Sequence, residues 1–335
     1  MRVLVTGGNG FIGSAVVRGL VSSGHEVVCL LRRTSRTERI DDLPILRASG
    51  DVCDVESLRA AAAGCAGTIH LAAPGGWGSD EPETLRRVIE GGTRNVLDVA
   101  RELDNHRVVF VSSTAAINAS DRPHIFDERA LFTLRDRSLH YAHAKHQAEL
   151  LAQVAHVRGV PVVIVNPAEV YGPNDTALGT ARNLVDFATS RPVLVCRGGT
   201  SVVHVSDVAA GAIAALHRGQ PGERYILAGE NITIRQLALL VLDVLGRHAR
   251  IIRIPNVLAR AVSRAAVRMH IPLPYDPHVV PYATRYWFVD SRKARRELGV
   301  SFRGARDTIA PTLAWLQHAG FIPMTDGRSP GSVIS

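Results

Sequence analysis

The chain has 335 residues, 46% of them hydrophobic, and a formal net charge of +8 at pH 7. This apolar content is enough for one large domain or for a domain with a smaller lobe, and it excludes a disordered chain. The arginines are scattered rather than gathered in one run, so we expect no nucleic-acid partner, because such binding needs a basic patch or stripe.

Up to Asn166 the chain alternates between short β-branched runs and helical patterns, which is typical of parallel βαβ units. Strands that are apolar throughout, such as 162–165, indicate a sheet covered on both faces by helices. The expected strands are 2–5, 26–31, 46–49, 67–71, 107–112 and 161–166, and the expected helices are 14–23, 55–63, 83–102 and 141–158.

After Asn166 proline and glycine become frequent and the elements shorten. Strands are expected at 202–205 and 224–227, and helices at 232–246, with Thr233 as its N-cap, and at 291–298. We therefore predict an α/β protein with a Rossmann-type, doubly wound parallel sheet and a smaller C-terminal substrate-binding lobe. The expected division is 1–168 for the cofactor domain, with 195–220 returning to it, 169–194 and 221–325 for the lobe, and 326–335 for a flexible tail.

A glycine-rich turn follows the first expected strand and opens the first expected helix, which is the context that a dinucleotide site requires. Its glycines allow a tight turn and let the backbone approach a pyrophosphate at the helix N-terminus. A glycine turn without a ligand is the alternative. The residues expected at the cofactor here are Gly7, Gly10, Phe11, Ile12 and Gly13.

The end of the second expected strand carries Arg32 and Arg33 and no carboxylate. An NAD site places an acid there for the ribose hydroxyls, whereas an NADP site needs a cation for the 2′-phosphate. Arginine suits phosphate because its planar guanidinium can donate two parallel hydrogen bonds. We predict NADP (NADPH) rather than NAD, with Arg32 as the main contact and Arg33 or Ser35 assisting. A solvated arginine loop is the alternative.

Tyr141 and Lys145 lie four residues apart at the start of an expected helix, so they share one face. A phenol has a pKa of about 10, too high for acid–base catalysis at neutral pH, and a neighbouring ammonium lowers that pKa. Ser112, Ser113 and Thr114 end an expected strand, where a hydroxyl can hold a carbonyl oxygen. The pattern predicts redox chemistry at a carbonyl or alcohol carbon.

Together these motifs resemble the extended short-chain dehydrogenase/reductases, the superfamily of NAD-dependent epimerases and dehydratases. The resemblance covers nearly the whole chain, because further segments match at 50–52, 70–73, 203–208 and 290–294. Segments 163–167 and 222–227 are most similar to the dihydroflavonol-4-reductase-like branch, which includes proteins labelled hopanoid-associated sugar epimerases.

The resemblance implies a role for each residue of the site. Ser113 is then the catalytic serine with Thr114 as a fallback donor, and Lys145 also holds the nicotinamide ribose. The resemblance also implies that the cofactor is lined by Asp51 and Val52 at the adenine, by Ala72 and Ala73, and by Pro167 near the nicotinamide. A homodimer packed through the helices 83–102 and 141–158 is a further expectation.

Two positions depart from the family's pattern. Many members carry an Asn three residues before the Gly of a Gly-Thr pair, where it supports a water beside the catalytic lysine. Here that residue is Ile89, so the proton relay needs another route. Nucleotide-sugar epimerases usually place a phosphate-binding Arg four residues before the His of His-Val-x-Asp. Here that residue is Thr200, with Arg197 nearby, which argues against a nucleotide-sugar substrate.

Candidate substrate contacts lie on loops beside the expected cofactor crevice. They are Trp77 on a glycine-rich loop, Thr114, and Glu169 with Tyr171 after the sixth expected strand; a structural role is the alternative for each. The four cysteines show neither Cys-x-x-Cys spacing nor histidine partners at zinc spacing, so we expect no metal.

We predict an NADPH-dependent ketoreductase that reduces a carbonyl of a small molecule, such as a polycyclic compound or secondary metabolite, to an alcohol. Ser113 holds the carbonyl, Tyr141 is the general acid and Lys145 tunes Tyr141. The alternatives are a nucleotide-sugar epimerase or dehydratase with retained NAD(P), and a non-catalytic NADP-binding sensor. The sequence shows no signal peptide and no spanning segment, so we expect a cytoplasmic protein without a membrane partner.

Overall fold

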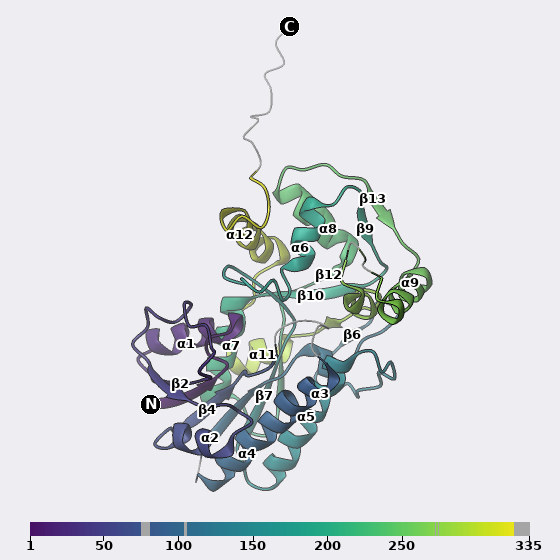
Figure 1. The fold of residues 1–335 in the computed structure, drawn as a ribbon. Coiled ribbons are helices and arrows are strands. Elements are labelled where there is room, and N and C mark those ends of the chain that lie inside the picture. The colour runs from purple at the N-terminus through teal and green to yellow at the C-terminus, as the bar shows by residue number, and fades with distance from the viewer. Residues whose placement is uncertain (75–80, 104–105, 272, 274, 325–335) are drawn as a thin grey trace.

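A seven-stranded parallel sheet forms the centre of the larger part of the molecule (Figure 1). The structure is a computed structural model that describes residues 1–74, 81–103, 106–271, 273 and 275–324. The strand order is β11-β7-β5-β4-β1-β2-β3. The strands are β1 Arg2–Thr6, β2 Glu26–Leu31, β3 Leu46–Ser49, β4 Gly67–His70, β5 Arg107–Val111, β7 Val162–Pro167 and β11 Arg224–Leu227. The order reverses between β1 and β4, and open α/β sheets bind ligands at such a point.

Helices cover both faces of this sheet, as the apolar strands predicted. One face carries α1 Phe11–Ser22 and α7 Val205–Arg218, and the other carries α2 Val55–Ala62, α4 Gly92–Glu102 and α5 His140–Val157. Along β1, Val3 and Val5 join the first core and Leu4 joins the second. Successive side chains of a strand point to opposite faces, so a strand between two helical layers must be apolar throughout.

A smaller lobe lies beyond the sheet, above it in Figure 1. Its three-stranded sheet, of order β12-β10-β8, shares a core with three helices. The strands are β8 Glu169–Tyr171, β10 Gly199–His204 and β12 Glu230–Thr233, and the helices are α6 Arg182–Thr189, α8 Ile234–Val244 and α12 Ala305–His318. Thr233 and Gln236 form a reciprocal capping box at the start of α8, so the cap expected at Thr233 is confirmed.

Further elements complete the described structure. They are the strand pairs β9 Val193–Val195 with β13 Ile251–Arg253 and β6 Ile125–Phe126 with β14 Phe288–Val289, the helices α9 Asn256–Met269, α10 Val280–Ala283 and α11 Arg292–Leu298, and the short turns η2 Thr114–Ala116 and η3 Pro277–Val279. Among them, β9 packs in the core of the lobe. Within the described ranges, none of the helices has both the length and the apolar character to cross a membrane.

The elements expected up to Asn166 are present, with ends that differ by a few residues. The expected helix 83–102 contains a π-helical stretch, because α3 Pro82–Leu85 runs through η1 Arg86–Gly91 into α4. Gly92 lies at this junction, and a Cβ there would come within 2.8 Å of a Val52 methyl. The glycine lets α4 approach the loop after β3.

Three expectations for the second half differ from the structure. The expected strand 202–205 ends at His204, because the His204 Nδ1 accepts a hydrogen bond from Ser206 N at 3.1 Å and thereby caps α7. Within 195–220, β10 belongs to the lobe and only α7 returns to the sheet. Within 221–325, β11 is an edge strand of the main sheet and α11 packs on α7 and β11. The lobe segments inserted after β7 hide this last crossover from the sequence pattern.

Candidate active site

The turn between β1 and α1 forms a helix start suited to an anion. Gly7 has a φ of +71°, and a Cβ there would lie 2.8 Å from Ala72 N. A Cβ on Gly13 would collide with the carbonyl oxygen of Gly7. The N-cap residue of α1 is Gly10, and no side chain caps the helix. The first N–H groups of α1, on Phe11 and its neighbours, therefore have no acceptor within the helix and can bind a pyrophosphate.

Arg32 and Arg33 begin an exposed loop at the end of β2. Ser35 Oγ accepts a hydrogen bond from Arg32 N at 3.1 Å, which turns the loop back on itself. Burial raises the pKa of the Cys53 thiol, and the charge of Arg32 is among the influences that oppose this rise. Arg32 therefore lies near the loop after β3, where the Asp51 carboxylate accepts a hydrogen bond from Cys53 N at 2.9 Å. The residues expected around the adenosine are thus brought to one edge of the sheet, together with the buried Val52.

The ends of β4 and β7 complete this edge. Ala72 and Ala73 follow β4 and are partly exposed, and Ala72 N donates to Thr6 Oγ1 at 3.3 Å. His70 Nδ1 lies 2.7 Å from the same hydroxyl, and burial lowers the pKa of His70 to about 3, so its ring is neutral. Pro167 is buried at the end of β7.

Ser113, Tyr141 and Lys145 meet between β5 and α5. Ser113 follows β5, and its Oγ accepts a hydrogen bond from Ala115 N at 3.2 Å. Tyr141, in the first turn of α5, is hydrogen-bonded to the Ser113 side chain. Lys145 lies one turn later, is only 3% exposed, and donates to the Val111 carbonyl at 3.0 Å. Its Nζ lies 5.9 Å from the centre of the Tyr141 ring.

Burial sets the protonation of this group. Burial raises the pKa of Tyr141 to about 12, and the hydrogen bond with Ser113 opposes that rise. Burial also lowers the pKa of Lys145 to about 8, and the nearby charge of Glu149 opposes this decrease. Burial, rather than the ammonium group expected from the sequence, therefore dominates the pKa of Tyr141. At neutral pH the site holds a neutral phenol, which is a proton donor.

A buried polar network behind Lys145 did not emerge from the sequence. Glu149, one turn further along α5, is 1% exposed and accepts hydrogen bonds from Asn166 Nδ2 at 2.5 Å and Arg224 Nη1 at 3.2 Å. The same Asn166 nitrogen donates to the Ser113 carbonyl at 2.9 Å. Burial raises the pKa of Glu149, while Arg224 is among the groups that lower it. The available sequence signal was a carboxylate four residues after the lysine, on the same helix face.

The residue at the expected relay position, Ile89, adds no polar group there. Ile89 is 1% exposed and belongs to the apolar core of α2, α4 and α5. The contact that the structure shows for the lysine ammonium is instead the Val111 carbonyl. Thr200 is buried in β10, whereas Arg197 is exposed on the loop that precedes this strand.

The candidate substrate residues fall in different environments. Thr114 is buried in η2. Asn183 Nδ2 donates to Glu169 Oε1 at 2.9 Å and to the Tyr171 hydroxyl at 2.7 Å. Tyr171 is fully buried in the lobe core, so it offers no surface to a substrate in this conformation. Trp77 lies outside the described residues, and the described residues contain no cluster suited to a metal ion.

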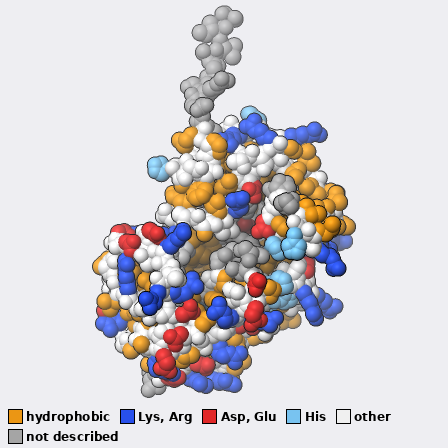
Figure 2. Space-filling model, viewed as in Figure 1, with side chains coloured by type: hydrophobic (Ala, Val, Ile, Leu, Met, Phe, Trp, Pro, Cys, Tyr) orange, Lys and Arg blue, Asp and Glu red, His pale blue; other side chains and the backbone are white. Residues whose placement is uncertain are grey.

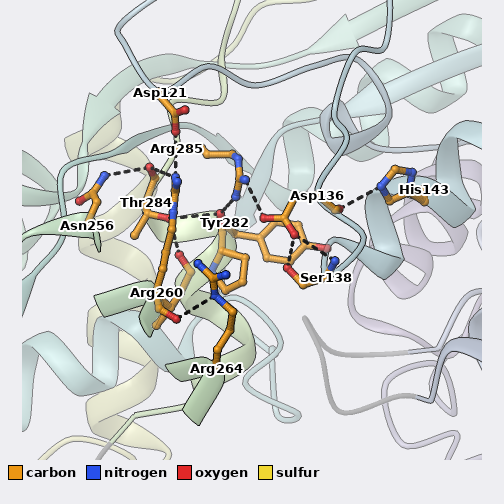
Figure 3. A network of polar contacts seen from close by, with 12 residues as sticks. Asp121, Asp136, Ser138, His143, Asn256, Arg260, Arg264, Tyr282, Thr284 and Arg285 are labelled. Atoms are coloured by element: carbon orange, nitrogen blue, oxygen red, sulfur yellow. Dashed lines mark hydrogen bonds and ion pairs between the residues drawn. The ribbon is translucent and has the colours of Figure 1, made fainter. Parts of the chain in front are cut away.

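A polar network ties the lobe to the start of α5 (Figure 3). Arg285 donates to Asp136 at 2.7 Å, and Arg260 of α9 donates to Thr284 Oγ1 at 2.7 Å. Burial by itself raises the pKa of Asp136, but hydrogen bonds from Ser138 and Arg285 bring it down to about 2. The ionised Asp136 therefore fixes the segment around α9 and α10 against the loop that leads into the catalytic helix.

Comparison with known proteins fits this geometry. Residues 3–228 match the model of the NAD dependent epimerase/dehydratase family. The chain belongs to this family. It is 31% identical to a putative dihydroflavonol 4-reductase of Synechocystis, over 95% of each chain. It is also 31% identical to a 4-hydroxy-2-methyl-3-oxo-4-farnesyl-3,4-dihydroquinoline-1-oxide ketoreductase of Stigmatella aurantiaca, over 98% of this chain and 99% of that protein.

Solved structures agree with the fold. The crystal structure of gox2253 superposes with a TM-score of 0.84 at 31% identity, covering 96% of this chain and 99% of the other. The UDP-glucose 4-epimerase of Thermus thermophilus in complex with NAD gives a TM-score of 0.75 at 24% identity, covering 95% of this chain and all of the other (100%), and shows the fold alone. This member of the epimerase/dehydratase family is an NAD(P)-dependent oxidoreductase of the extended short-chain type, in the dihydroflavonol-4-reductase-like branch.

Replacing Glu149 by Leu should destabilise this family member strongly. The change leaves the Asn166 amide and the Arg224 guanidinium without their buried acceptor, and breaking a buried pair in this way costs about 3 kcal/mol. Glu149→Gln, which keeps an oxygen for Asn166, should lose less. Chemical denaturation measures the loss. Glu102→Leu breaks an exposed pair with Arg59 and is the matched control, expected to change stability by less than about 1 kcal/mol. Equal losses in Glu149→Leu and Glu102→Leu would contradict the prediction.

Proposed function

We propose that this protein is an NADPH-dependent ketoreductase that reduces a carbonyl of a ring-containing small molecule to an alcohol. The observation that carries the proposal is the neutral Tyr141 phenol, hydrogen-bonded to Ser113 beside the buried Lys145. A protonated phenol is the form that can give a proton to a carbonyl oxygen as it is reduced.

The residues divide the work of the reaction. When bound, NADPH is the source of the hydride that the carbonyl carbon receives. The Ser113 hydroxyl holds and polarises the carbonyl oxygen, and the Tyr141 hydroxyl gives that oxygen its proton. Lys145 supplies a positive charge next to the tyrosinate that remains, which favours the charged form of the phenol after proton transfer. The product is the alcohol, and Tyr141 regains its proton from solvent.

Features of the cofactor site support NADP over NAD. The end of β2 carries two exposed arginines and no carboxylate, which favours a 2′-phosphate over free ribose hydroxyls. The uncapped start of α1 fits a pyrophosphate. Asp51, Val52, Ala72, Ala73 and Pro167 are proposed to line the rest of the cofactor.

The substrate class is proposed from the relatives. Their names specify a dihydroflavonol and a farnesylated dihydroquinoline oxide, both ring-containing compounds. Thr200, where sugar-nucleotide epimerases usually carry a phosphate-binding Arg, supports the same choice. Thr114 and Glu169 remain candidates for substrate contact, and the homodimer through α4 and α5 remains a prediction.

Changing Tyr141 to Phe should abolish ketone reduction. Absorbance of the reduced nicotinamide, followed with NADPH and a panel of polycyclic ketones, should fall steadily with the wild type and at least about 100-fold more slowly with Tyr141→Phe. NADPH affinity should stay unchanged. The matched control is Tyr225→Phe on β11, because the hydroxyl of this tyrosine bonds the Gln220 backbone and the Glu297 side chain rather than Ser113. NADPH binding without consumption by the wild type, together with tightly held NAD(P) after purification, would favour the epimerase or sensor alternatives.

The pH profile of reduction should fall on its alkaline side. The kcat/KM reports the free enzyme, in which the pKa of Lys145 is lowered to about 8 and that of Tyr141 is raised to about 12. As pH rises through 8, the ammonium is lost while the phenol keeps its proton, so kcat/KM for reduction should decrease. Lys145→Arg, which keeps the charge, should move any remaining decrease to higher pH. A kcat/KM that rises with pH would mean that the reaction needs the Tyr141 phenolate instead.

Replacing Arg32 and Arg33 by Ser should weaken NADPH binding selectively. Loss of charged hydrogen bonds to a phosphate should raise the Kd of NADPH about tenfold and leave that of NADH nearly unchanged. Titration calorimetry with both cofactors measures this. Arg122→Ser, at an exposed position of another loop, is the control. Equal weakening for the two cofactors would contradict a 2′-phosphate site.

A further inference from the structure

The helix α9 turns its large apolar side chains outward and its small ones inward. Its buried positions are Ala259, Ser263 and Ala266. Leu258 is 55% exposed and Met269 is 66% exposed. Surface helices of soluble proteins normally show the opposite pattern, with large apolar residues facing the core.

The exposed apolar residues form a continuous stripe. Leu258, Val262, Ala265 and Met269 follow the spacing i, i+4, i+7 and i+11, which keeps them on one side of the helix, and all four are exposed. Val257 lies beside the stripe and is also exposed. A contiguous exposed apolar surface of this kind marks a site of contact with another protein or with a membrane.

The strand before α9 adds to this surface. Ile252 of β13 and Leu194 of β9 are register partners, and both are exposed. Figure 2 shows hydrophobic side chains gathered in the area where Figure 1 places α9, with Lys or Arg side chains at its edge. We call α9 with these two strand residues the α9 face.

The charge around the α9 face is predominantly positive. From Val244 to Tyr275 the sequence contains six arginines and neither Asp nor Glu. Arg264 and Arg268 are exposed on α9 and lie outside the apolar stripe. Arg260 differs from Arg264 and Arg268 because it forms an ion pair with the exposed Asp121 at 2.8 Å. An apolar stripe flanked by arginines is the pattern of helices that lie in the interface of an anionic membrane.

We propose that the α9 face docks this protein on the surface of an anionic phospholipid bilayer. The apolar stripe enters the boundary between headgroups and acyl chains, and the arginines bind the lipid phosphates. The sequence analysis expected no membrane partner because it found no membrane-spanning segment. A helix that lies on the membrane surface needs no such segment. The network through Arg260, Thr284, Arg285 and Asp136 ties α9 to the start of α5, so docking holds the catalytic helix at a fixed position relative to the membrane.

The positive charge of the α9 face favours an anionic bilayer over a second copy of the chain as the partner of this surface. Two α9 faces brought together would oppose arginine to arginine with no carboxylate between Val244 and Tyr275 to pair them. A bilayer has a flat, anionic and fluid surface that accepts a protruding helix without a preformed groove. Docking does not depend on the proposed reductase reaction, and binding is measured without turnover.

Flotation with vesicles tests the proposal on the full chain. The protein should float with vesicles of phosphatidylcholine and phosphatidylglycerol, and remain in solution with vesicles of phosphatidylcholine alone. Leu258→Gln with Met269→Gln should reduce the bound fraction at least about tenfold, because two inserted side chains are lost. Arg264→Glu with Arg268→Glu should reduce it by at least as much. All these side chains are exposed, so the melting temperature should stay at the wild-type value.

The matched control changes the same residue types on another helix of the lobe. Arg235→Glu with Leu239→Gln alters an exposed arginine and an exposed leucine on α8 and should leave flotation unchanged. The proposal is overturned if the wild type fails to float with the anionic vesicles, or if Leu258→Gln with Met269→Gln floats as well as the wild type. It is also overturned if flotation is absent and sedimentation velocity shows an oligomer that these variants dissociate, since the occupant is then a second copy.

Discussion

The amide of Asn166 is the contact on which the active site depends. It comes from the end of β7 and donates both to the Ser113 carbonyl after β5 and to the Glu149 carboxylate in α5. Two strands and one helix are thereby held by a single buried nitrogen. Glu149 is in turn paired with Arg224 of β11, so the edge strand of the sheet is part of the same network. The two contacts of the Asn166 nitrogen hold the backbone at Ser113 against α5, the helix that carries Tyr141.

Burial gives the site its chemistry. The same packing that hides Lys145 and Tyr141 from water raises the pKa of the phenol and lowers that of the ammonium. The site therefore holds a phenol that keeps its proton and a lysine whose charge is lost at a moderately alkaline pH. Carbonyl reduction, the reaction proposed for this site, needs the first of these states.

The two ends of the molecule present different surface chemistry. The sheet edge presents the uncapped start of α1 and the arginines after β2, which suit an anionic cofactor. The lobe presents the α9 face, whose outward apolar stripe and unopposed arginines suit an anionic surface. The polar network around Asp136 connects this face to the catalytic helix, so a contact at the lobe is mechanically linked to the position of Tyr141.

The sequence by itself determined the parallel sheet, the glycine turn and the Tyr141–Lys145 spacing, because each depends on residues close together in the chain. It also placed the hydroxyls of Ser112, Ser113 and Thr114 at the sheet edge, since they follow the end of a strand, and the family resemblance implied Ser113 among them. It did not determine that β11 joins the main sheet, because the lobe segments after β7 separate the two pairing strands. Nor did it show the link from Asn166 to Glu149, or the outward apolar stripe of α9. These depend on which faces of distant elements meet, and only tertiary packing decides which side chains are buried together and which remain exposed.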